Sequence, residues 1–397
     1  MSIPVEFMLF AATLVGVALL HSRSLEVAAC GLGVILVYKL AFTGIHGLNG
    51  LGGLLHHLAA EWVIMANLFC LLVGFAVLSR HFEQSRVPDR LPELLPDDWR
   101  GGFVLLVLVF VLSGFLDNIA AALIGGTVAA SVYRRKVHIG YIAALVAAAN
   151  AGGAGSVVGD TTTTMMWIDG VSPGQIFHAY VAAVAALVVF GIPAAIQQQR
   201  YSPIMAHSEK PMPVDWPRIA VVGLVLFAAV ATNVTMNVRF PQVATLFPFI
   251  GVAVWIVLLA AARWRAPDWT VIPGALRGTV FLLCLVFAAS LMPVEELPPP
   301  SWQTAFGLGF VSAVFDNIPL TKLALEQGGY DWGMLAYAVG FGGSMLWFGS
   351  SAGVAITNLF PEARAVGPWL RSGWHVAVGY VVGFFTLLLI LGWHPQE

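Results

Sequence analysis

The sequence predicts an all-α polytopic membrane protein of about 10 transmembrane helices in two inverted five-helix repeats, each with a re-entrant hairpin and a broken helix. Composition is the first observation behind this prediction. Hydrophobic residues make up 59% of the 397 residues and charged residues only 10%. A chain with so little polar surface cannot cover a soluble core. Its repeated apolar runs of about 17 to 25 residues are long enough for helices to cross the hydrocarbon.

A repeated pair of polar motifs is the second observation. Asp117-Asn118 and Asp316-Asn317 each interrupt an apolar segment, and each is followed by the pattern Gly-Gly-x5-Gly, at 152–159 and at 342–349. The polar residues that come directly after these glycines are Asp160, Thr161 and Thr162 in the first half, and Ser350 and Ser351 in the second. Because the same order of motifs occurs twice, we expect two related halves.

The first half is expected to begin with apolar spans at about 5–20, 25–43 and 61–79. The polar loop that follows contains three prolines, which exclude a continuous helix. The remaining predicted elements are a hairpin at about 101–133, a broken helix at about 138–169 and a span at about 174–196. We assign residues 1–200 to this first inverted repeat and residues 201–217 to a polar cytoplasmic linker.

The second inverted repeat is assigned to residues 218–397. Its expected elements, in chain order, are apolar spans at about 218–236, 242–262 and 271–292, a hairpin at about 301–327, a broken helix at about 331–360 and a last span at about 369–392. A polar motif interrupts the hairpin and the broken helix at the same places as in the first half.

The distribution of Lys and Arg is the third observation, and it sets the orientation. These residues gather in short cytoplasmic loops. If both hairpins enter and leave the membrane on the same side, all 19 basic residues except Lys39, Arg239 and Lys322 lie on the cytoplasmic side. Each half then crosses an odd number of times, so the second half is inserted upside down. We therefore expect an inner (plasma) membrane protein with both termini outside, in the periplasm.

Two carboxylates mark the candidate ion site of the first half. A charge at mid-bilayer costs about 2.5 to 3.5 kcal/mol, so it needs a partner, a proton or an ion. No Lys or Arg of the first half is placed to pair with Asp117 or Asp160, which favours a bound cation or proton. The alternative is that both side chains stay protonated and only bond to neighbouring helices.

An all-oxygen shell of the kind that Na⁺ or Li⁺ prefers can form around these carboxylates. Glycines allow the backbone to leave the helix, so that carbonyls join threonine hydroxyls and the amide oxygen of Asn118. The predicted cation and proton site comprises Asp117, Asn118, Gly159, Asp160, Thr161 and Thr162, with Asp117, Asn118 and Asp160 as Na⁺ ligands. The alternative for the glycines is close helix packing through small residues.

The second half differs in its chemistry. Its candidate site residues are Asp316, Asn317, Ser350, Ser351 and Lys322. Lys322 could lie within reach of Asp316 and take the place of a second cation. Alternatively, it pairs with Glu326 at i+4 and extends toward the membrane surface. Elsewhere, the i, i+4 spacing of His57 and Glu61 fits either a metal site or a hydrated interface.

These motifs resemble those of the ion transporter superfamily, which contains citrate and dicarboxylate carriers, arsenite permeases and NhaD-type sodium/proton antiporters. Segments 150–167, 315–320 and 342–354 look most like the NhaD-type sequences. The resemblance implies a homodimer with an ion site in each half, formed by a hairpin tip and the break in the following helix. Carried over to this chain, it assigns Asp117, Asn118, Gly159, Asp160 and Thr161 to the first site, and Asp316, Asn317, Ser350 and Ser351 to the second. Lys322 departs from the pattern expected of the family.

We therefore expect a secondary transporter, not an enzyme, and most simply an Na⁺/H⁺ antiporter in which the two ions compete for Asp117 or Asp160. No resident cofactor is implied, since Na⁺ or Li⁺ would be the transported or coupling ion. The expected partners are the lipid bilayer, a small ion and a second copy of the chain, with no nucleic acid.

The main alternative is Na⁺- or H⁺-coupled transport of a small anion, such as citrate, a dicarboxylate or an inorganic oxyanion. Helix N-termini, hydroxyls and Lys322 would hold that anion. No Arg near the proposed centre offers bidentate capture of a carboxylate. The sequence has no His-Glu-x-x-His motif of a metalloprotease, and no evident ring of pore-lining residues indicates a channel.

Overall fold

The computed structural model describes residues 4–20, 23–45, 50–204, 213–244, 246–315 and 317–395. All secondary-structure elements assigned within these ranges are helices. Six of the helices are long and apolar enough to cross a membrane, and shorter apolar helices accompany them. The long ones are Ser24–Thr43, Gly50–Gln84, Pro173–Tyr201, Trp216–Met236, Trp269–Ser290 and Trp374–Leu391. The all-helical membrane architecture predicted from composition is confirmed.

The first half contains nine α-helices among the described residues, together with a π-helical and a 3-10 segment. They are α1 (Val5–Leu19), α2 (Ser24–Tyr38), η2 (Lys39–Thr43), α3 (Gly50–Gln84), η3 (Pro88–Leu94), α4 (Trp99–Ser113), α5 (Asn118–Val132), α6 (Ile139–Ala154), α7 (Thr161–Ile168), α8 (Pro173–Phe177) and α9 (Ala179–Tyr201). The segment expected to form a hairpin thus consists of α4 and α5, which contact each other, and the segment expected to break consists of α6 and α7.

The second half follows a similar order. Its elements are α10 (Trp216–Arg239), α11 (Pro241–Ala244), α12 (Phe249–Ala261), η4 (Trp269–Val271), α13 (Ile272–Ser290), η5 (Val294–Glu296), α14 (Trp302–Ser312), α15 (Asn317–Gln327), α16 (Trp332–Gly342), η6 (Gly343–Met345), α17 (Ser351–Leu359), η7 (Pro361–Ala363), α18 (Val366–Ser372) and α19 (Trp374–Leu391). Helices α14 to α17 correspond in order to α4 to α7.

Helices α6 and α16 form the buried centre of the molecule. Every residue of α6 from Gly140 to Ala154 is buried, and so is every residue of α16. Alanine and glycine are frequent in both, and small residues let neighbouring helices approach closely. The two helices contact each other, and α9 and α19 pack against both of them. The elements that precede the glycine motifs therefore meet at the core.

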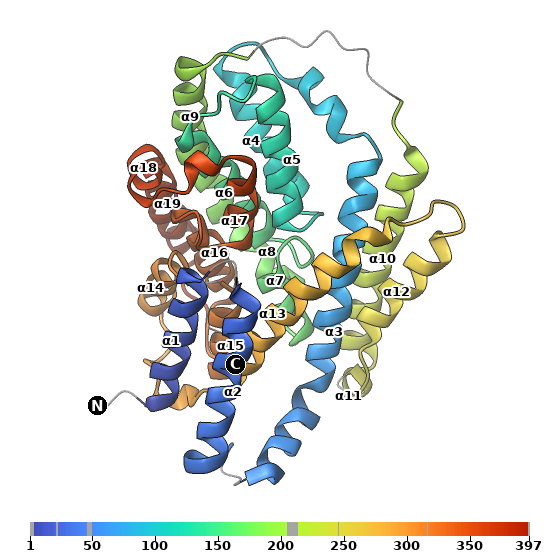
Figure 1. Ribbon diagram of the computed structural model, residues 1–397, viewed down its shortest axis with the longest axis vertical. Coiled ribbons are helices and arrows are strands. Elements are labelled where there is room, and N and C mark those ends of the chain that lie inside the picture. The colour runs from blue at the N-terminus through green and yellow to red at the C-terminus, as the bar shows by residue number, and fades with distance from the viewer. Residues whose placement is uncertain are drawn as a thin grey trace.

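The outer helices form two groups. Helices α3, α10 and α12 contact one another, while α1 and α13 pack against α2. Helix α13 also contacts α3 and so connects the groups. Figure 1 shows α10 and α12 beside α3, on the opposite flank of the molecule from α18 and α19.

The glycines of the first motif allow two backbones to approach closely. A Cβ atom at Gly152 would lie 2.0 Å from the carbonyl oxygen of Phe110, and one at Gly159 would lie 2.0 Å from that of Ser113. Both oxygens belong to α4, the first arm of the predicted hairpin. Real Cβ atoms do not approach oxygen so closely, so only glycine fits at either position.

The second half repeats this arrangement. A Cβ atom at Gly342 would lie 2.2 Å from the carbonyl oxygen of Gly309, and one at Gly349 would lie 2.4 Å from that of Ala313. These oxygens lie in and directly after α14, at positions equivalent to the contacts of α4. Close packing therefore accounts for these glycines in both halves, as the alternative interpretation of the motif proposed.

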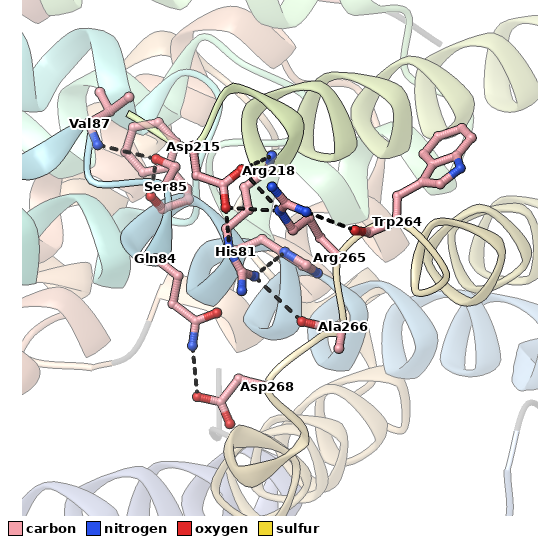
Figure 2. Close-up of polar contacts among 11 residues, drawn as sticks. His81, Gln84, Ser85, Val87, Asp215, Arg218, Trp264, Arg265, Ala266 and Asp268 are labelled. Carbon is pink, nitrogen blue, oxygen red and sulfur yellow. Dashed lines mark hydrogen bonds and ion pairs between the residues drawn. The ribbon is translucent and has the colours of Figure 1, made fainter. Parts of the chain in front are cut away.

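An ionic network joins α3 to the end of the linker and to the loop between α12 and α13 (Figure 2). Asp215 caps the start of α10 and accepts hydrogen bonds from Arg265 at 3.0 and 3.1 Å. Its backbone N–H donates to the carbonyl oxygen of Ser85 at 2.9 Å. The hydrogen bonds from Arg265 lower the pKa of Asp215, which keeps this carboxylate ionised.

Two more contacts belong to the network. Arg218 donates to Nδ1 of His81 at 3.0 Å, because a guanidinium can only donate. Arg80 donates to Asp268 at 3.0 Å. Hydrogen bonds from Thr270 and Arg80 lower the pKa of Asp268 to about 2. The network therefore persists at neutral pH and fixes this end of α3 against the second half.

The packing of the glycine motif predicts a specific loss of stability. Gly152→Ala forces α6 away from α4, and overpacking of this kind costs about 1 to 3 kcal/mol. We expect a lower midpoint of thermal denaturation for the detergent-solubilised variant. Gly223→Ala is the matched control, because a Cβ at this helical position in α10 meets nothing within 4 Å. Equal midpoints for the two variants would contradict the packing role.

Candidate ion-binding site

Three helices begin directly at the predicted polar motifs, and each has its motif residue as its N-cap. Asp117 accepts the backbone N–H of Ile119 at 2.8 Å at the start of α5. Asp160 and Ser350 cap α7 and α17 in the same way. Such caps satisfy N–H groups that a helix leaves unpaired. The breaks in the two halves are thus built alike, with a carboxylate in the first and a hydroxyl in the second.

The Asp160 carboxylate is held by uncharged donors from both halves. Its side chain is buried, with 3% exposed. Thr162 Oγ1 donates to Oδ2 at 2.8 Å, and the side-chain amides of Asn118 and Asn317 lie 3.3 and 3.5 Å from Oδ1 and Oδ2. Within the described ranges no Lys or Arg side chain forms an ion pair with Asp160. An ionised carboxylate here therefore lacks a cationic partner from those residues.

Asn150 connects the two breaks. This fully buried side chain accepts a hydrogen bond from Asn118 at 3.1 Å and donates to Ser344 and Ser350 at 2.9 and 3.0 Å. It lies on α6 directly before the first glycine motif, whereas Ser344 and Ser350 belong to the break between α16 and α17. Residues that the resemblance assigns to two sites are therefore joined in one polar network.

Asn150 and Ser344 were not among the site residues predicted from the sequence. The available signal was a single asparagine in an otherwise apolar helix, immediately before the glycines. Gly340 is a further contributor, because a Cβ there would lie 3.2 Å from Oδ2 of Asp160. The absence of a side chain at Gly340 leaves the carboxylate room beside α16.

The other predicted residues of the first site lie next to this network. Asp117 is half-buried, and its carboxylate interacts electrostatically with that of Asp160. The carbonyl oxygen of Gly159 accepts the backbone N–H of Asn118 at 3.1 Å, which joins the start of α5 to the break. Thr161 is half-buried in the first turn of α7. Asp117 is thus near enough to Asp160 for the two carboxylates to interact electrostatically, while the printed hydrogen bonds of the network converge on Asp160.

A cavity of about 270 Å³ adjoins the network on the side of α17. Its polar lining comprises Ser24, Ser350, Ser351 and Asn358, and the rest of the lining is apolar. Ser350 also belongs to the central network, through its hydrogen bond with Asn150. Arg364 donates to the side chain of Asn358. The cavity therefore extends from Ser350, in the second break, to Asn358, which accepts a hydrogen bond from Arg364.

Lys322 forms two ion pairs in a buried position. Its ammonium lies 2.6 Å from Glu326 on the same helix and 2.8 Å from Glu61 on α3, and its side chain is 2% exposed. The pairing with Glu326, one of the two alternatives for Lys322, is present, but the ammonium is buried and does not extend to a surface. Asp316, the alternative partner, lies outside the described residues. The pairing with Glu61 was not predicted.

A family model and several named proteins match most of this chain. A family model described as citrate transporter matches residues 7–342. Sodium/proton antiporter 1 of Arabidopsis thaliana is 30% identical over 360 residues, which is 78% of this chain and 58% of that protein. The Na⁺/H⁺ antiporter NhaD of Alkalimonas amylolytica is 29% identical over 65% of this chain and 62% of its own length. The NhaD antiporter of Halomonas elongata is 25% identical over 81% and 75%, respectively. The chain thus spans less than two thirds of the length of the first two relatives.

The bridging position of Asn150 predicts that its loss destabilises the protein. Asn150→Ala removes one hydrogen-bond partner from each of the buried side chains of Asn118, Ser344 and Ser350, at a cost of about 1 to 3 kcal/mol. We expect a lower denaturation midpoint in detergent than for the wild type. The control is Gln303→Ala, at an exposed glutamine of α14, where the expected change is within about 0.5 kcal/mol. A midpoint unchanged in Asn150→Ala would contradict the bridging role.

Proposed function

The chain belongs to the citrate transporter family, and from that membership we propose that it is a secondary transporter that exchanges Na⁺ for H⁺ across the inner membrane. The observation that carries the proposal is the buried Asp160 carboxylate, whose described donors are all uncharged. Relatives named as sodium/proton antiporters, at 25 to 30% identity, support the same activity.

Competition between the ions follows from the charge of the site. A buried carboxylate without a cationic partner favours a bound proton or metal ion, and either one neutralises it. One carboxylate cannot hold both ligands at once. The neutral, loaded site crosses the apolar barrier at a lower cost than the charged, empty site, so each direction of movement requires one of the two ions.

The amides of Asn118 and Asn317 provide a switch between the two loaded forms. In the arrangement described, both amides turn their NH₂ groups toward Asp160. An amide rotated by about 180° presents its oxygen instead. The same side chains can therefore donate to the bare carboxylate or coordinate Na⁺ together with Asp160 and the Thr162 hydroxyl.

Alternating access would use the repeated architecture. We propose that the two halves are inverted five-helix repeats of about 10 transmembrane helices in total, with the α4–α5 and α14–α15 hairpins opening to opposite sides. Both termini would be periplasmic and the protein a homodimer. The contacts of α5 with α17 and of α7 with α15 support this model, because each hairpin packs on the broken helix of the other half.

Coupled uptake of a small anion is the second candidate. Among the described residues, those that line the cavity beside Ser350 and Ser351 supply hydroxyl and amide groups and no carboxylate, and Arg364 reaches its wall through Asn358. The start of α17 also directs its N–H groups toward this region, which favours negative charge. In this reaction Na⁺ at Asp160 would be the coupling ion.

Exchange predicts a proton flux that depends on Na⁺ and on Asp160. Purified protein is placed in sealed liposomes with an acidic lumen and an internal pH dye. Addition of Na⁺ or Li⁺ outside should raise the internal pH in the wild type, whereas Asp160→Asn, which cannot be protonated or bind the cation by charge, should lose at least 90% of this response.

The matched control is Asp89→Asn, at an exposed aspartate of η3, which should keep the wild-type rate. A wild type that shows no response in vesicles that hold their pH gradient would contradict exchange. Na⁺-dependent uptake of labelled citrate or succinate by the same vesicles would then establish the second candidate.

A further inference from the structure

Glu61, Lys322 and Glu326 form a buried ion triad away from Asp160. The Lys322 ammonium lies 2.8 Å from Glu61 and 2.6 Å from Glu326. The two carboxylate side chains are 13% and 22% exposed, and the lysine is 2% exposed. Lys322 and Glu326 are one turn apart on α15, whereas Glu61 comes from α3. One ammonium thus serves two carboxylates from different helices.

The charges around this triad do not balance. Lys322 and Glu326 neutralise each other on the same helix, which leaves the charge of Glu61 in excess. Asp169, at the end of α7, interacts electrostatically with all three and adds negative charge. On α3, His57 bonds to Ser290 at 2.9 Å. In the neighbouring η2, Lys39 pairs with Glu6 at 3.6 Å. Among the described residues, no second cation forms an ion pair with Glu61.

Two adjacent helices connect the triad with Asp160. Helix α7 begins after Asp160 and ends before Asp169, and α15 begins at Asn317, which donates to Asp160, and contains Lys322. The two helices contact each other. The eight residues of α7 span about 12 Å, which separates Asp160 at its start from Asp169 at its end. A shift of α15 that alters the Asn317 contact also moves Lys322 relative to Glu61.

We propose that Glu61 is a second proton-binding carboxylate of the transport cycle, separate from Asp160; this inference rests on the proposed Na⁺/H⁺ exchange. While the site is open to the side from which protons enter, α15 moves away from α3, Lys322 leaves together with Glu326 as a neutral pair, and Glu61 takes up one proton from the water on that side. After the site opens to the opposite side, α15 returns and the ammonium replaces that proton, which is released there. With the proton carried at Asp160, each cycle moves two protons against one Na⁺ and therefore one net charge.

The test is the voltage dependence of the exchange. Proteoliposomes with equal internal and external pH are clamped at about 59 mV with K⁺ and valinomycin, and the Na⁺ ratio at which proton flux reverses is measured. One net charge per cycle shifts this ratio tenfold at that voltage. We expect the tenfold shift in the wild type and no shift in Glu61→Gln, which keeps an acceptor for Lys322 but cannot carry a proton.

Glu26→Gln is the control, because Glu26 forms an exposed ion pair with Arg277 at 3.0 Å; it should keep the tenfold shift. If Glu61→Gln does not fold, Glu326→Gln replaces it, since it leaves Glu61 paired one to one with Lys322 and should also abolish the shift. A tenfold shift in Glu61→Gln, or none in the wild type, overturns the role of Glu61 while exchange stands. Absence of Na⁺-driven proton flux in the wild type overturns the exchange itself.

Discussion

The buried carboxylate of Asp160 is the constraint on which the central part of the molecule depends. It must be satisfied away from water, and its described partners are neutral amides and a hydroxyl taken from α5, α7 and α15. These partners reach it because the hairpin arms α5 and α15 both pack against the broken helix α6–α7 that carries Asp160. Glycines make this packing possible, because they have no Cβ atom and let the backbones of neighbouring helices approach closely. The helix packing that forms the core therefore also positions the partners of Asp160 at the candidate ion site.

The two halves share an architecture but differ in charge. Asp160 and Ser350 occupy equivalent N-caps, so the first break contributes a carboxylate and the second a hydroxyl. Asn150 hydrogen-bonds to the second break and, through Asn118, to the carboxylate of the first. This asymmetry places the Asp160 carboxylate of the first break between amide and hydroxyl groups from both halves. In the exchange that we propose, a single monovalent cation would compete with a proton for this carboxylate.

Much of the architecture could be predicted from the sequence because its causes are local. Composition indicates membrane helices, and glycines followed by Asp160 or Ser350 mark helix breaks with their caps. The pairing of Glu61 with Lys322 could not be predicted, because 261 positions separate the two residues and no local pattern records which distant helices meet. The role of Asn150 could not be predicted either, because its partners Ser344 and Ser350 lie in the other half of the sequence.

The central claim is that Na⁺ and H⁺ compete for one buried carboxylate. The most direct measurement is equilibrium binding of radioactive Na⁺ to the purified protein across a range of pH, with proton release recorded in weakly buffered solution. Competition predicts that each bound Na⁺ releases a proton, and that the apparent affinity falls about tenfold for each unit of pH below the point where the site protonates. Na⁺ binding of equal affinity at every pH, with no proton released, would contradict the account.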